Sequence, residues 1–142
     1  MEVMDAIKAR RAYRSLDPVV ITENLIKDFA RSAGLAPSCF NYQPLRLIFV
    51  KDPAVLREIH GNLSKTNRWV ERASMIVAVF SKEGDDCMVK GRNYHQFDTG
   101  MAVGFLLLRA TELGLVAHPF AGYREKAVKG ILDIPEEYQL IA

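Results

Sequence analysis

The spacing of apolar residues along the chain predicts both helices and strands. Apolar positions three or four residues apart indicate amphipathic helices over residues 2–11 and 23–33. Thr22 can cap the second helix, because its hydroxyl can accept a hydrogen bond from a free backbone amide. Gly34 is expected to end that helix in the left-handed conformation. A third helix is expected over residues 53–63, since proline suits a first helical position.

Apolar runs of strand length separate these helices. Residues 45–50 are expected to form a strand, and the uninterrupted apolar run 75–80 predicts a central strand that is buried on both faces. Residues 116–120 are expected to be extended, residues 125–132 helical, and residues 138–142 a further strand. Because helices and strands occur in clusters rather than in strict alternation, the predicted fold class is α+β.

The longest predicted helix, over residues 93–113, has an unusual middle section. Residues 101–108 are apolar on every side of the helix, and such a helix must be buried all round. In a chain this small, one way to bury it is to pack it across a dimer axis, where Gly104 would permit close approach of another backbone.

Composition excludes several classes of protein. The 142 residues suit a single domain, and a 49% hydrophobic and 25% charged composition is that of a globular chain. The net charge of +2 argues against a nucleic-acid-binding protein. The longest apolar run is shorter than the roughly 20 residues that span a membrane, and the first residues do not form a signal peptide. Cys39 and Cys87 lack CxxC spacing, so we expect free thiols in a reducing cytoplasm.

Three short segments could bind a ligand. Arg10-Arg11-Ala12-Tyr13-Arg14 places three guanidinium groups where they could clamp a phosphate, although a solvated basic helix end is the ordinary interpretation. The loop over residues 36–44 holds amide side chains between two prolines, and the turn over residues 118–122 is fixed by a proline and a glycine. Each segment alone is explained equally well as a connection between elements.

In their order along the chain, these segments resemble the nitroreductase family of FMN enzymes. The resemblance extends from Met4 to Ala142 and implies a central, mainly antiparallel sheet flanked by helices, in an intertwined homodimer. Its most specific stretch is Ala36-Pro37-Ser38-Cys39-Phe40-Asn41-Tyr42-Gln43-Pro44, with further matches at Asp98-Thr99-Gly100, at Glu112-Leu113-Gly114-Leu115 and at the Pro119 to Gly122 turn.

The resemblance also implies which residues contact FMN. Arg10 and Arg14 match basic residues near the phosphate and the pyrimidine edge, Arg11 lies between them, and Ala12 stands where the family usually carries Ser. The remaining implied contacts are Pro37, Ser38 and Cys39, which reach FMN from the partner subunit; Asn41 and Gln43, which shape that loop and the ring's polar edge; Asn67; and Pro119, Phe120, Ala121 and Gly122, which lie against the ring.

The implied activity is hydride transfer from NADH or NADPH, through FMN, to a small acceptor such as a nitroaromatic, a quinone or a dedicated metabolite. The two half-reactions are expected to follow a ping-pong order. The cofactor performs the chemistry, so no catalytic side chain is assigned. A flavin-binding sensor or storage module without turnover is the alternative from another class. Basic phosphate-binding residues near the family's C-terminus have no counterpart here, so we expect a C-terminal segment to be missing from this sequence.

Other kinds of site have less support. Cys39 with a histidine could form a nucleophilic pair, but an isolated cysteine is more often inert. His95 and Asp98 could touch at i, i+3 spacing, yet no further ligand has the spacing of a metal site, so no metal is expected. The chain contains no GxGxxG or P-loop pattern, so a Rossmann domain or an NTPase is not supported.

Overall fold

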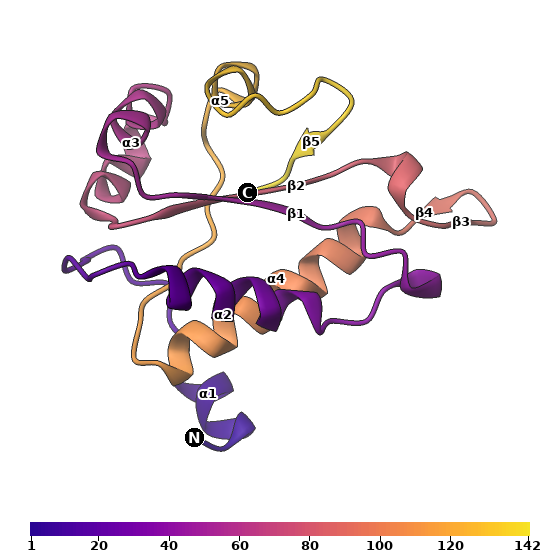
Figure 1. Cartoon of the computed structure of the whole chain (residues 1–142), viewed down its shortest axis with the longest axis horizontal. Coiled ribbons are helices and arrows are strands. Elements are labelled where there is room, and N and C mark those ends of the chain that lie inside the picture. The colour runs from indigo at the N-terminus through magenta and orange to yellow at the C-terminus, as the bar shows by residue number, and fades with distance from the viewer.

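A three-stranded antiparallel sheet of order β1–β2–β5 separates two layers of helices in the computed structural model, which describes residues 1–142 (Figure 1). On one face lie α3 and α5, and on the other lie α2 and α4 (Figure 1). This arrangement confirms the expected α+β class and the antiparallel sheet. The elements are β1 Arg46–Val50, β2 Ile76–Ser81 and β5 Gln139–Leu140, with α2 Glu23–Gly34, α3 Pro53–His60, α4 His95–Glu112 and α5 Glu125–Ile131.

Both faces of the sheet are covered by apolar side chains. In β1, Ile48 and Val50 pack into the core under α3 and α5, whereas Leu47 and Phe49 pack into the core formed with α2 and α4. Successive side chains of a strand point to opposite faces, so an apolar run buries both. Five of the six residues of β2 are buried, which confirms the prediction for the run 75–80.

Two helix starts follow the predicted local signals, whereas several helix ends do not. The helix predicted over residues 53–63 ends at His60, and the one predicted over residues 2–11 ends at Ala9. The hydroxyl of Thr22 accepts a hydrogen bond from the amide of Leu25, and Pro53 begins α3, as predicted. Gly34 does not adopt the expected left-handed conformation, because α2 includes it and ends on Leu35. Gly114, with φ of +73°, is the glycine that ends a helix in this way.

Helix α4 is buried along one stripe only. Its buried residues include Ala102, Leu106 and Ala110, which recur every four residues and face α2 and the sheet. Phe97 is 63% exposed and Phe105 is 42% exposed. The expectation of burial on every side is therefore wrong within one chain, because α2 and the sheet together contact a single face of the helix.

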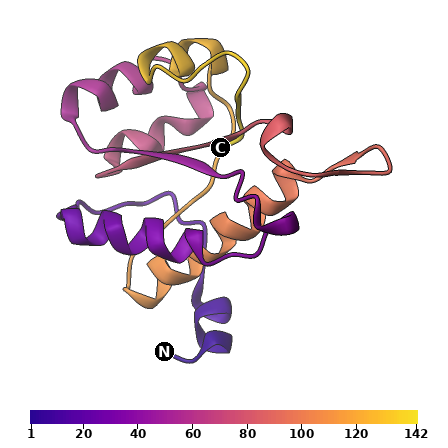
Figure 2. The same cartoon turned by 45° about the vertical axis from the view of Figure 1, so that its right-hand side comes forward.

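Two further elements lie at the edges of the molecule. Helix α1, Val3–Ala9, stands apart from the sheet, and the hairpin of β3 (Met88–Val89) and β4 (Arg92–Asn93) projects away from it (Figure 2). No strand was predicted for the residues of this hairpin. None of the helices combines the length and the apolar character needed to cross a membrane.

Candidate functional site

The basic segment that follows α1 has no acidic partner. The helix ends at Ala9, and Arg10 turns the chain out of it with φ −56° and ψ 125°. The guanidinium of Arg11 donates to the carbonyl oxygens of Lys8 and Arg10. Neither Arg10, Arg11 nor Arg14 forms an ion pair within the chain. These guanidinium groups are therefore available to a bound anion.

Trp69 connects this basic segment to the turn over residues 118–122. Its ring stacks on His118 with centroids 4.3 Å apart, and the guanidinium carbon of Arg14 lies 6.0 Å from the centroid of the Trp69 ring. Nδ1 of His118 donates to the carbonyl oxygen of Tyr13 at 3.1 Å. The structure thus brings together two sequence-predicted segments, and it does so through an aromatic residue to which the sequence had assigned no role.

The turn at Gly122 depends on the absence of a side chain. Gly122 has φ of +90°, and a Cβ atom there would lie 2.8 Å from Oγ of Ser64 and 3.0 Å from Nδ2 of Asn67. The Asn67 amide donates to the carbonyl oxygens of Ala121 and Gly122. Asn67 was predicted as a flavin contact, and the structure shows that its amide nitrogen holds this turn in shape.

Several donors at this turn and beside it have no partner in the chain. The backbone amides of Phe120, Ala121 and Gly122 donate to no acceptor, and Nε1 of Trp69 is buried without one. A cavity of about 360 Å³ extends from Trp69, His118, Pro119 and Phe120 between α4 and the sheet, with mainly apolar walls. Free amides beside an apolar cavity are suited to a flat ligand with a polar edge.

The loop over residues 37–44 is held by internal contacts and by α4. Phe40, Asn41 and Gln43 all have positive φ, which non-glycine residues rarely adopt. Oγ of Ser38 accepts from the amide of Gln43 at 2.9 Å, and the Cys39 amide donates to Oδ2 of Asp98 at 2.6 Å. The Ser38 hydroxyl, a predicted cofactor contact, is used here to close the loop.

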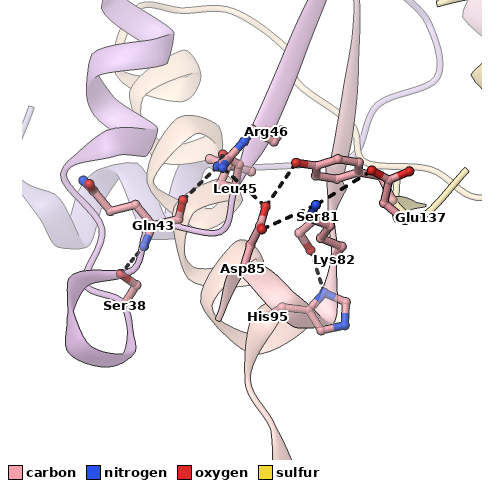
Figure 3. A network of polar contacts seen from close by, with 10 residues as sticks. Ser38, Gln43, Leu45, Arg46, Ser81, Lys82, Asp85, His95 and Glu137 are labelled. Atoms are coloured by element: carbon pink, nitrogen blue, oxygen red, sulfur yellow. Dashed lines mark hydrogen bonds and ion pairs between the residues drawn. The ribbon is translucent and has the colours of Figure 1, made fainter. Parts of the chain in front are cut away.

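A network of charged groups fixes the far end of the same loop (Figure 3). Arg46 donates to the carbonyl oxygens of Gln43 and Leu45, and its other terminal nitrogen lies 3.3 Å from Oδ2 of Asp85. The Tyr138 hydroxyl donates to that same carboxylate oxygen at 3.1 Å. Asp85 therefore links the loop before β1 to the segment that leads into β5.

The two cysteines are not free thiols. A disulfide joins Cys39 to Cys87, with 6.1 Å between their Cα atoms. The prediction of free thiols is wrong, because the fold brings the loop over residues 37–44 against the segment before β3 and so places two distant cysteines side by side. Cys39 also has no histidine partner, since Nδ1 of His95 is hydrogen-bonded to Ser81 and His118 stacks on Trp69.

The predicted site residues fall into two groups within one chain. The basic segment, Asn67 and the turn at Gly122 converge around Trp69. The loop over residues 37–44 lies instead beside the β3–β4 hairpin, at the opposite end of α4 (Figure 1). One chain alone does not bring the loop to the basic segment.

The chain is similar to known proteins over its whole length. The sequence model of the Nitroreductase family matches residues 7–66 and 60–142. A Thermus thermophilus protein named NADH dehydrogenase is 25% identical, over 95% of this chain and 82% of its own length. A nitroreductase family protein from Clostridium novyi NT has a TM-score of 0.91 at 23% identity, covering 100% of this chain and 82% of that one. A crystal structure described as an oxidoreductase containing FMN has a TM-score of 0.83 at 25% identity, over 95% of this chain and 71% of its own.

Proposed function

Because the chain belongs to the Nitroreductase family, as its sequence resemblance predicted, we propose that it is an FMN-dependent oxidoreductase that takes hydride from NADH or NADPH. The observation on which the proposal rests is that Arg14 and the turn at Gly122 converge around Trp69. The similar proteins described as NADH dehydrogenase and as an FMN-containing oxidoreductase support the choice of donor and cofactor.

The residues present fit FMN by their chemistry. Arg10, Arg11 and Arg14 would hold the phosphate, because guanidinium groups without an acidic partner bind anions strongly. The unpaired amides of the turn at Gly122 would face the polar atoms of the ring. When bound, FMN supplies a ring that can accept and return two electrons. The chain's own part is to bind, to orient and to keep water away from this turn.

We further propose a homodimer in which each flavin contacts two chains. In one chain the loop over residues 37–44 lies away from the arginines, so a partner would have to supply it. Exposed apolar side chains on α1 and α4, among them Val3, Ile7, Phe97 and Phe105, would be covered in such an assembly. Burial of a large apolar side chain contributes roughly 1.5–3 kcal/mol.

Titration with FMN tests the binding site. Arg10→Ala should weaken FMN binding about 10-fold to 100-fold, because a charged hydrogen bond contributes about 1.5–3 kcal/mol. Arg57→Ala is the matched control, since Arg57 lies on α3 and contacts no part of the site. Quenching of flavin fluorescence on binding gives the dissociation constant for each variant. Equal affinity of the Arg10 variant and the unsubstituted protein would refute the assignment.

Turnover separates an enzyme from a flavin-binding sensor or storage module. Oxidation of NADH and NADPH is followed with a nitroaromatic or a quinone as the acceptor. We propose that donor and acceptor use one cleft in turn. Double-reciprocal plots of initial rate against donor concentration, at several acceptor concentrations, should therefore give parallel lines. Intersecting lines would contradict the ping-pong order, and flavin binding without turnover would favour the sensor.

A further inference from the structure

The environment of Cys39 and Cys87 contains more than a disulfide. The ligand atoms of Cys39, Asp86 and Cys87 all lie within 4.8 Å of one another. These residues are brought together from two segments, the loop over residues 37–44 and the turn before β3, which are 48 positions apart. Cysteine sulfur and carboxylate oxygen, both present here, are ligand types that bind Zn²⁺ in proteins.

The negative charge of this cluster is not balanced by a cation. Oδ1 of Asp86 accepts from the amide of Cys87 at 2.8 Å, but its Oδ2 is buried without any partner. Asp98, 4% exposed, holds the Cys39 amide nearby. No lysine or arginine forms an ion pair with either carboxylate.

We propose that the reduced form of this cluster is a binding site for a zinc-class divalent cation, with Cys39, Cys87 and Asp86 as its ligands. A water molecule completes the coordination, as in zinc sites that have three protein ligands. Asp98 is a positioning residue, because it fixes the backbone of Cys39 and adds negative charge beside the ion. Soft thiolates with a hard carboxylate favour Zn²⁺ over Mg²⁺ or Ca²⁺.

Reduction is needed before metal can bind. A phosphine reductant supplies two electrons to the Cys39–Cys87 bond and is itself oxidised to the phosphine oxide, while two protons from water complete two thiols. Binding of the cation then releases the thiol protons to solvent. In the oxidised chain the two sulfur atoms are bonded to each other and cannot act as thiolates, so the disulfide form should not bind the cation. The test of this site uses the metal alone and requires no flavin.

Titration of the full chain with Co²⁺ under argon tests the proposal, after reduction and removal of the phosphine. The reduced protein should bind one Co²⁺ per chain with an intense near-ultraviolet thiolate band, and Zn²⁺ should displace it. The oxidised protein should show no such band. Cys39→Ser and Cys87→Ser should abolish the band, and Asp86→Asn should lower affinity at least about 10-fold. Glu83→Gln, an exposed acid in the same turn, is the matched control and should bind normally.

Three results would overturn the proposal. One is a reduced protein that gives no thiolate–cobalt band, and another is a band that survives Cys87→Ser. The third is a thiol count that stays at zero in phosphine, which would make the link between Cys39 and Cys87 a permanent cross-link. Far-ultraviolet circular dichroism of each variant shows that a lost band does not come from unfolding. Asp98→Asn should lower affinity by about 10-fold without abolishing the band, whereas unaltered affinity would contradict its positioning role.

Discussion

Replacing Gly122 by alanine should destabilise the protein by about 2–5 kcal/mol. The left-handed backbone at φ +90° costs an alanine roughly 1–2 kcal/mol. The new Cβ would also displace the Asn67 amide, which it would approach to 3.0 Å. Asn67 is only 6% exposed, so losing its two carbonyl partners should cost about 1–3 kcal/mol more. Urea unfolding measured against the unsubstituted chain gives the difference in free energy.

Substitutions at two other glycines separate the backbone cost of Gly122→Ala from the cost of displacing Asn67. Gly114 has φ of +73° but no atom within 4 Å of an added Cβ, so Gly114→Ala should show the backbone cost alone. Gly34 is helical and open, so Gly34→Ala should stabilise by up to about 1 kcal/mol. If Gly122→Ala costs no more than Gly114→Ala, the argument that Asn67 holds the turn is refuted. In that case Ser64 and Asn67 simply move aside.

Three further predictions concern pH, an ion pair and the loop. Burial lowers the pKa of His60 below 6.5, so the free energy of unfolding should fall as the pH drops from about 7.5 to about 5.5. In urea unfolding, His60→Gln should flatten this pH dependence. An unchanged pH dependence in the variant would show that His60 is not its source. Arg109→Ala removes the 2.7 Å ion pair with Asp28 that joins α4 to α2. The free energy of unfolding should fall by up to about 1 kcal/mol, and by less in high salt. A loss that does not change with salt concentration would argue against an ionic origin. Asp98→Ala should lower the free energy of unfolding by about 1–3 kcal/mol and should speed hydrogen exchange at the Cys39 amide. If that amide remains protected from exchange, another group holds the loop.

The fold class could be predicted from the sequence because its signals are local. The apolar run 75–80, the cap at Thr22 and the proline at position 53 each describe the preference of a few neighbouring residues, and the structure confirms all three. The β3–β4 hairpin was missed because its strands are only two residues long and follow a charged stretch. Two-residue strands give no periodicity to detect.

The candidate site could be predicted in part, through the order of its segments. The basic segment and the turn at Gly122 do meet, but they meet at Trp69, a residue that no pattern had singled out. Asn67 and Ser38 were proposed as cofactor contacts, and the structure shows both also hydrogen-bonded within the chain. A side chain's own partner depends on what the fold places beside it, which residue type and spacing do not reveal.

The sequence by itself determined the fold class, the positions of the main helices and of the buried central strand, and the family to which the chain belongs. Only the tertiary structure decided that Cys39 meets Cys87, that Asp98 supports the loop, and that one face of α4 remains exposed. The physical reason is the range of each interaction. Backbone preference and apolar periodicity act over a few residues, whereas contacts between segments 48 residues apart depend on how the sheet and helices pack.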